Sequence, residues 1–229
     1  MFRYFVYFVI FGYFVIKDLM HSFYERYWEY RADEHVSEHD FALKWPKLQG
    51  YIPMEGGVTV VDFGCGNGEL LSEMEALNPG AKYVGLDVSA AALNAAAARF
   101  PHMKFHRIVE SGELPLETGS ADFVLSTEVI EHIYDTENAF AEIARILRPG
   151  GRLLMTTPYH GLIKNLLTVA LAFDRHFDPL GPHVRFFSKK SLFSCLRRVG
   201  LEPVEHGHYG RFYPVPHSIV VLAEKGGST

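Results

Sequence analysis

The sequence predicts an α/β fold, a doubly wound, mostly parallel, seven-stranded sheet with helices on both faces. From Thr59 onward, short apolar runs rich in β-branched residues alternate with segments of helical composition, a pattern typical of parallel sheets. The first run ends in an acid and three alternating glycines, which predicts a strand that passes through a tight turn into a helix. The last two runs, 201–206 and 218–222, flank a loop rich in glycine, proline and aromatic residues. They predict a final antiparallel hairpin.

Individual residues mark where the predicted helices begin and end. Ser89, Asp135 and Ser188 can each accept hydrogen bonds from the first turn of the helix that follows. Proline and glycine mark the helix ends, because proline lacks an N–H and glycine adopts the left-handed conformation that closes a helix. In chain order, the sequence predicts helix 41–48, strand 59–63, helix 68–76, strand 82–86, helix 90–99, strands 103–108 and 123–126, helix 135–147, strand 152–157, helices 162–173 and 189–199, and strands 201–206 and 218–222.

Composition narrows the class of protein. The chain has 229 residues, of which 48% are hydrophobic and 21% charged, and this suits one globular domain with a full core. A net charge of −5 argues against a nucleic-acid substrate, which usually requires a basic surface. The two cysteines, Cys65 and Cys195, have no metal-binding spacing and indicate no disulfide framework. We therefore expect a reducing, cytoplasmic location.

The first 19 residues differ in composition from the rest. Residues 4–16 carry no charge and are mostly Phe, Tyr, Val and Ile, but they are short of the roughly 20 residues that cross a bilayer as a helix. Three interpretations stay open: an anchor that makes peripheral membrane contact, an arm packed on the domain, or a segment upstream of a natural start at Met20. We predict a single domain over residues 20–225, and expect a protein that begins at Met20 to fold and bind its cofactor.

The glycine-rich turn predicts the kind of ligand. Its spacing, Gly64, Gly66 and Gly68, departs from the G-x-G-x-x-G pattern of pyrophosphate-binding turns. Asp62 lies within the turn, where a carboxylate would repel pyrophosphate but would suit a ligand with a cationic end. Asp87 ends the next strand 25 residues later, at about the distance (roughly 20 residues) of an acid that binds a ribose diol. A ribose with an ammonium group and no phosphate describes S-adenosylmethionine.

The order of motifs resembles that of class I S-adenosylmethionine-dependent methyltransferases, in the branch that includes the ubiquinone-pathway O-methyltransferases. The resemblance covers residues 23–222 and implies a Rossmann-like fold, an N-terminal helical cap and an insertion near 160–185. Besides the glycine turn and Asp87, the motifs that carry it are Leu114-Pro115-Leu116, Ala121-Asp122-Phe123-Val124, Glu128-Val129-Ile130-Glu131-His132 and Leu147-Arg148-Pro149-Gly150-Gly151.

The resemblance also implies a set of cofactor-binding residues. Asp62 would face the ammonium end, and Asp87 would bind both ribose hydroxyls. Within the turn, Gly64, Cys65 and Gly66 would lie against the methionine part. The remaining implied contacts are those of Val88, Glu110 and Ser111 with the adenine and of Thr127 with the methionine end.

His132 is the candidate catalytic residue, because a hydroxyl acceptor must lose a proton and an imidazole of ordinary pKa can take it. The alternative is a histidine that only shapes the turn. Glu128, Glu131 and His132 have the i, i+3, i+4 spacing of one helical face, and His183 lies downstream. Metal-dependent relatives use a similar set to hold a divalent cation. We favour a pocket without a metal.

We expect methyl transfer to a hydroxyl of a small, partly apolar molecule. The apolar segment 162–173 and the aromatic residues that follow it favour such an acceptor. Two alternatives are a metal-dependent RNA 2′-O-methyltransferase, which the acidic net charge disfavours, and a non-catalytic ligand-binding protein, which the intact glycine turn and Asp87 disfavour.

Overall fold

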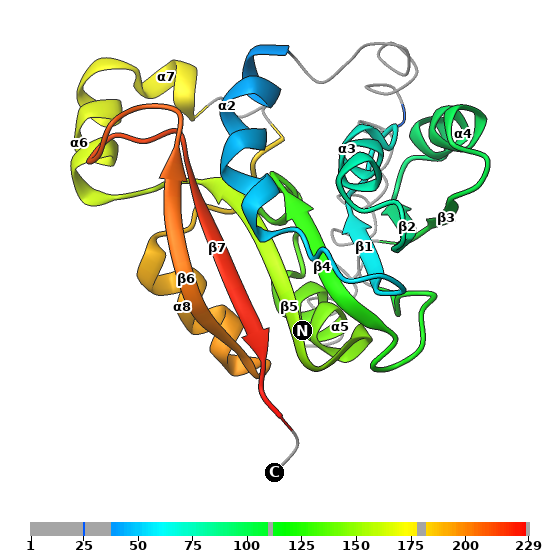
Figure 1. Ribbon diagram of the computed structural model, residues 1–229. Coiled ribbons are helices and arrows are strands. Elements are labelled where there is room, and N and C mark those ends of the chain that lie inside the picture. The colour runs from blue at the N-terminus through cyan, green and yellow to red at the C-terminus, as the bar shows by residue number, and fades with distance from the viewer. Residues whose placement is uncertain (1–24, 26–37, 110–111, 178–181, 228–229) are drawn as a thin grey trace, which may run out of the picture.

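A single twisted sheet organises the protein. The computed structural model describes residues 25, 38–109, 112–177 and 182–227. Within this part of the chain, seven strands follow the order β3-β2-β1-β4-β5-β7-β6 (Figure 1). Neighbouring strands from β3 to β5 are parallel, whereas β7 is antiparallel to both β5 and β6. The predicted doubly wound sheet with its final hairpin is confirmed. The strands are β1 (Thr59–Phe63), β2 (Lys82–Asp87), β3 (Lys104–Arg107), β4 (Ala121–Thr127), β5 (Leu147–Pro158), β6 (Leu201–Tyr209) and β7 (Ser218–Lys225).

Helices cover both faces of this sheet. Successive residues of a strand point to opposite faces, so Val60 belongs to one buried cluster with Leu48 and Met74. The next residue, Val61, belongs to a second cluster with Ile143 and other residues of the opposite face. The helices that contribute to the first cluster are α2 (Glu38–Leu48), α3 (Glu69–Leu77) and α4 (Ala90–Arg99), and those of the second are α5 (Thr136–Ile146) and α8 (Lys189–Arg198).

The strand order places a ligand site at one edge of the sheet. From β1 the chain proceeds outward through β2 and β3, and then returns to place β4 on the other side of β1. The loops that follow β1 and β4 therefore diverge at the carboxyl ends of the parallel strands. Ligands of open α/β sheets bind at such a reversal point.

All three predicted helix caps are present. The Ser89 hydroxyl accepts a hydrogen bond from the N–H of Ala92, and the Asp135 carboxylate accepts one from the N–H of Asn138. Ser188 and Ser191 form a reciprocal capping box at the start of α8. Local sequence was sufficient to predict these boundaries, because a cap satisfies N–H groups only three residues away.

Several predicted elements differ from the structure by up to three residues at their ends, and two differ in kind. The expected helix 162–173 ends at Ala172, whose φ of −153° breaks it into α6 (Leu162–Leu171) and α7 (Phe173–His176). Strand β5 begins at Leu147, five residues before its predicted start. Leu147 pairs with Ala121, and the register then shifts so that Arg152 pairs with Phe123. The intervening residues bulge out of the sheet, and a bulge of this kind looks like a turn in the sequence.

The prediction for residues 1–19 lies outside the described residues, as do Glu110 and Ser111. Among the helices that the structure describes, none has the length and apolar character needed to cross a bilayer.

Candidate active site

The glycine turn after β1 is held close to β2. The N–H groups of Gly64 and Cys65 both donate to the carbonyl of Leu86, at 2.7 and 3.0 Å. Gly64 has φ +85°, and a Cβ on it would lie 2.3 Å from a methyl carbon of Val129. Only glycine suits this position, because both the conformation and the space exclude a side chain.

Asp62 lies under this turn as a buried carboxyl without a hydrogen-bond partner. It is 1% exposed, and neither of its carboxyl oxygens has a partner among the described residues. Burial raises its pKa to about 7, and the nearby charge of Asp87 adds to this, while Lys44 opposes it. A buried polar group of this kind is costly unless a ligand satisfies it. The ammonium end of S-adenosylmethionine would supply both the missing donors and the missing positive charge.

Asp87 ends β2 at the same edge of the sheet. One of its oxygens accepts a hydrogen bond from the N–H of Gly66 at 2.8 Å, and the other accepts one from the N–H of Ser89 at 2.9 Å. These bonds fix the carboxylate across the glycine turn. Each carboxylate oxygen can accept a second hydrogen bond, so Asp87 keeps the capacity to bind a diol. Burial nevertheless raises its pKa.

Three other predicted cofactor residues, Cys65, Val88 and Thr127, lie at or just past the ends of β1, β2 and β4. Cys65 is buried, and burial together with the charges of Asp62 and Asp87 raises the pKa of its thiol well above the usual range. The Cys65 side chain is therefore neutral and presents an apolar surface. Val88 packs on the core and its carbonyl accepts from Arg107. Thr127 is the half-buried last residue of β4.

Lys44 is a site residue that the sequence analysis missed. It lies on α2, is only 7% exposed, and its charge lowers the pKa values of both Asp62 and Glu131. A lysine is rarely buried unless it is near acids, so Lys44 offsets part of the negative charge of the pocket. The sequence did contain a sign of this role. Lys44 lies between Phe41 and Leu48 on the apolar stripe of α2, where a hydrophobic core residue is expected.

Three side chains named in the sequence analysis, those of Glu131, His132 and His183, meet beyond the end of β4, and the region around them is the candidate acceptor side. Atoms of Glu131, His132 and His183 lie within 4.8 Å of one another. The carbonyl of Glu131 accepts hydrogen bonds from the N–H groups of Val184 and Arg185, both at 2.9 Å. These bonds hold the loop that carries His183 against the short 3₁₀ helix Ile130–His132. The donor types suit a divalent cation.

The protonation state of this cluster follows from burial. Glu131 is 1% exposed, and burial followed by the charge of Glu128 raises its pKa to about 8. Burial lowers the pKa of His132 to about 4. The neutral His132 ring must donate from Nδ1, because that atom lies 3.1 Å from the carbonyl of Pro182. Its Nε2 therefore carries no proton and can accept one.

The prediction that Glu128 shares a helical face with Glu131 and His132 is wrong. Glu128 has φ +54°, the only positive value among the described residues other than glycine, so it is outside the 3₁₀ helix that holds Glu131. Its carboxylate accepts a hydrogen bond from the Tyr209 hydroxyl at 3.1 Å instead. The sequence spacing was right for an α-helix, but the chain must leave β4 through a strained residue to reach His132.

Beyond this cluster, histidine and aromatic side chains line the acceptor side. The ring of His160 lies 5.5 Å from that of His176 and 5.0 Å from that of Phe186. The ring of His208 lies 4.9 Å from Tyr159. Burial lowers the pKa of all three histidines and so favours their neutral form, and the nearby charge of Lys164 lowers the pKa of His160 and His176 further. The sequence did not reveal this group of histidine and aromatic side chains, because they come from separate segments of the chain.

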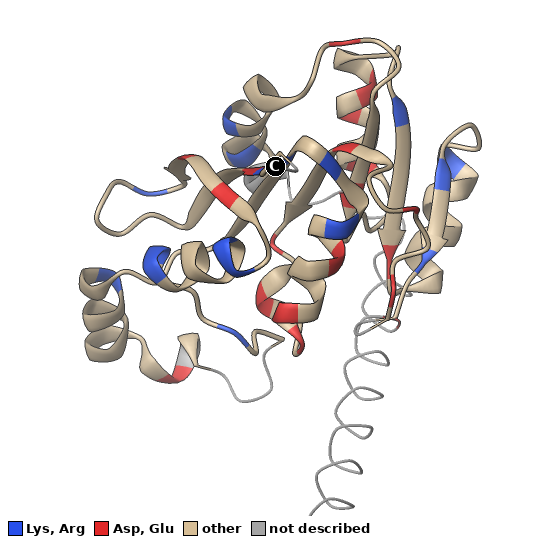
Figure 2. Cartoon of the chain, turned by 90° about the horizontal axis from the view of Figure 1, so that it is seen from below, with Lys and Arg blue, Asp and Glu red and all other residues tan. Residues whose placement is uncertain are grey.

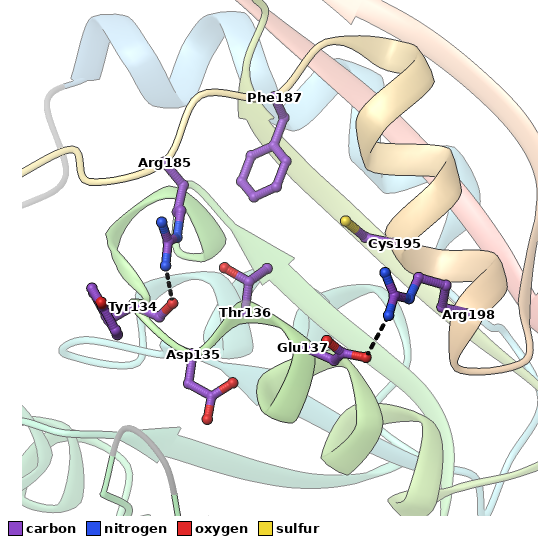
Figure 3. A pocket seen from close by; sticks show the side chains of 8 residues that line it. All are labelled: Tyr134, Asp135, Thr136, Glu137, Arg185, Phe187, Cys195 and Arg198. Atoms are coloured by element: carbon purple, nitrogen blue, oxygen red, sulfur yellow. Dashed lines mark hydrogen bonds and ion pairs between the residues drawn. The ribbon is translucent and has the colours of Figure 1, made fainter. Parts of the chain in front are cut away.

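A second pocket of about 480 Å³ lies between α5 and α8 (Figure 3). Arg185 closes one side, where it donates a hydrogen bond to the carbonyl of Tyr134, and an ion pair joins Arg198 to Glu137. None of the predicted cofactor residues lines it. Its lining residues are Tyr134, Asp135, Thr136, Glu137, Arg185, Phe187, Cys195 and Arg198.

Comparison with known proteins agrees with this arrangement. A methyltransferase domain family matches residues 27–206. A probable S-adenosylmethionine-dependent methyltransferase of Mycolicibacterium smegmatis is 32% identical over 64% of this chain, which spans 52% of that relative's length. The ubiquinone biosynthesis O-methyltransferase of Burkholderia pseudomallei is 30% identical over 82% of both chains. The crystal structure of an S-adenosylmethionine-dependent methyltransferase from Mesorhizobium loti superposes with a TM-score of 0.64 at 20% identity, covering 80% of this chain and 97% of that one.

The fold and the site thus define a Rossmann-like enzyme whose cofactor carries a ribose and a cationic end. The chain belongs to the S-adenosylmethionine-dependent methyltransferases.

Proposed function

We propose that this methyltransferase transfers a methyl group to a hydroxyl oxygen of a small, partly apolar acceptor. The observation that carries the proposal is the orientation of His132, whose Nδ1 donates to Pro182 and leaves Nε2 as the acceptor. S-adenosylmethionine supplies a methyl group already activated by a sulfonium. The residues of the site then have two tasks, to align the hydroxyl and to remove its proton.

A weakly basic histidine is sufficient for the second task. As the hydroxyl oxygen shares its electron pair with the methyl carbon, it becomes positively charged and its proton becomes strongly acidic. His132 Nε2 can take that proton although burial lowers its pKa to about 4. The products are a methyl ether, the demethylated cofactor and a proton on the imidazole.

The histidine and aromatic side chains of the acceptor side support a small and partly apolar molecule. Neutral His160, His176 and His208 can donate or accept hydrogen bonds, while Phe186 and Tyr159 offer aromatic surface. Pockets of this composition bind small organic ligands through a few polar contacts. The name of the Burkholderia relative refers to O-methylation and supports the same choice of atom.

The test is an acceptor panel with purified protein, S-adenosylmethionine and mass spectrometry of the products. The panel contains phenols and alcohols with apolar substituents, matched carboxylic acids and matched compounds without a hydroxyl. We expect methyl ethers from the hydroxyl compounds. Esters or carbon-methylated products alone would refute hydroxyl methylation.

A matched pair of histidine variants tests the role of His132. His132→Gln should lower kcat by about a hundredfold, a typical loss for a general base, while the Kd for the cofactor stays unchanged. His102→Gln is the control, since His102 bonds Glu75 on the exposed surface. Equal kcat values for the two variants would remove His132 from the chemistry.

A further inference from the structure

Helix α6 has its polar face turned inward and its apolar face turned outward. The partly buried positions are Gly161, Lys164, Asn165, Thr168 and Ala172, which follow the i, i+3, i+4, i+7 spacing of one helical stripe. The exposed positions between them are almost all large and aliphatic. This is the reverse of the pattern on a helix that packs on a hydrophobic core. The exposed α6 face consists of Leu162, Ile163, Leu166, Leu167, Val169 and Leu171.

Specific contacts fix the polar stripe against the rest of the protein. Lys164 Nζ donates a hydrogen bond to the carbonyl of His217 at 2.9 Å. Asn165 lies 3.1 Å from Nδ1 of His160, which belongs to the acceptor side. The only charged residue of α6 is therefore held inward, and α6 cannot turn its apolar face inward without breaking these contacts.

The exposure of this face is large. Leu166 is 61% exposed and Leu171 is 81% exposed, and no residue of α6 is buried. Phe173 of α7 and the aromatic pair Phe212 and Tyr213 of the β6–β7 loop extend the same kind of surface. Figure 1 shows α6, α7 and this loop together at one end of the molecule. Exposed apolar side chains gathered at one end of a protein indicate a binding partner.

The charge around this surface has the opposite sign to that of the whole chain. Among the described side chains of residues 159–177, 182–190 and 206–217 there are five Lys and Arg against one Asp and no Glu, although the chain has a net charge of −5. Figure 2 colours the Lys and Arg positions of the chain blue. Arg211 is exposed and directly precedes the exposed Phe212 and Tyr213 in the β6–β7 loop. Basic residues beside an aliphatic helix match an anionic lipid surface, which offers both an apolar phase and negative headgroups.

We propose that the α6 face docks the enzyme on an anionic lipid bilayer. The helix would lie in the plane of the interface, with its leucines among the acyl chains. The exposed positions of α6 offer aliphatic carbon and no polar side chain, whereas a protein interface would have a polar rim with hydrogen-bonding groups. Phe173, Phe212 and Tyr213 would lie at headgroup level, where aromatic side chains concentrate. Docking there would place the histidine-lined acceptor side beside the membrane.

Vesicle sedimentation of the full chain tests the proposal. The vesicles are phosphatidylcholine alone, or phosphatidylcholine with about one third phosphatidylglycerol. We expect binding to the mixed vesicles that weakens as salt is raised, because screening removes the electrostatic part. Leu166→Glu combined with Leu171→Glu should lower the partition constant by about tenfold or more, because two charges would enter the apolar phase.

A matched control uses two other exposed apolar residues. Met54 and Val204 are 63% and 54% exposed and lie outside the patch, so Met54→Glu combined with Val204→Glu should bind vesicles like the wild type. Both double variants should keep the Tm and the cofactor affinity of the wild type, since all four positions face solvent.

Three results would overturn the proposal. The first is a wild-type chain that does not bind the mixed vesicles. The second is an α6 double variant that binds them as well as the wild type, which would assign binding to another segment such as residues 4–16. The third is a wild-type dimer in analytical ultracentrifugation that the α6 double variant dissociates, because the face would then be an interface between two copies.

Discussion

The Glu25 carboxylate lies 3.0 Å from Nη2 of Arg107, whose Nε donates to the carbonyl of Val88. The same carboxylate accepts hydrogen bonds from the N–H groups of Ala90 and Ala91 at the start of α4. Glu25 thus joins the N-terminal part of the chain to the loop that follows Asp87. Burial raises the pKa of Glu25, but these hydrogen bonds and the charge of Arg107 outweigh it and lower the pKa.

Glu25→Ala should therefore weaken cofactor binding without removing a cofactor contact. Two helix N–H groups would lose their acceptor and Arg107 would lose one of its partners, and the loop after Asp87 would be less ordered. We expect a Kd about three- to tenfold higher by calorimetry, the effect of losing about 1 kcal/mol of capping energy. Glu75→Ala is the control, because Glu75 bonds His102 away from the site. Equal Kd values in the two variants would contradict this coupling.

Asp87→Ala should weaken S-adenosylmethionine binding much more. The ribose hydroxyls would lose a charged partner, and hydrogen bonds to a charged group contribute about 1.5–3 kcal/mol. Asp122→Ala is a matched control, since Asp122 also accepts a backbone hydrogen bond, from Thr59 at the opposite end of the sheet. It should lower Tm but keep the Kd. An unchanged Kd in Asp87→Ala would remove this residue from the site.

The buried Asp62 should make stability depend on pH. Its pKa rises from 3.8, the value expected in the unfolded chain, to about 7 in the folded protein. A raised pKa means that the folded state binds the proton more tightly. The stabilisation is complete below about pH 4 and is lost as the pH rises through 7, by at most about 1.4 kcal/mol per pH unit.

Asp62→Asn should remove this dependence in the cofactor-free protein. Relative to the wild type, the variant should gain Tm between pH 5 and pH 8 in thermal unfolding experiments. The wild type should also bind S-adenosylmethionine more tightly as the pH rises through 7, because the ammonium favours the ionised carboxylate. Parallel pH profiles of the two proteins would show that Asp62 does not titrate in this range.

Whether Glu131, His132 and His183 hold a metal ion that turnover requires can be tested directly. The geometry suits a cation, whereas burial raises the pKa of Glu131 to about 8 and favours a protonated carboxyl, whose proton a cation would have to displace. We expect turnover to continue in excess chelator. Loss of activity that Mg²⁺, Mn²⁺ or Zn²⁺ restores, together with loss of that restoration in His183→Ala, would show that these side chains hold a metal.

The sequence by itself predicted the fold and the two acids that meet at the carboxyl edge of the parallel strands. Helix caps such as Ser89 act over three residues, and the acids Asp62 and Asp87 follow directly after their strands. Such features are local, so composition and spacing reveal them. The alternation of strands and helices then leaves few possible topologies, and all of them bring the two acids to one edge of the sheet.

Only the tertiary structure decided the acceptor end. Lys44 approaches Asp62 and Glu131 from a helix for which the sequence analysis predicted no site residue. Glu128 departs from its expected face because the chain leaves β4 with a positive φ and Tyr209 of a distant strand binds its carboxylate. The outward apolar face of α6 likewise depends on Lys164 reaching His217. These are contacts between residues far apart in sequence, and side-chain packing in three dimensions determines them.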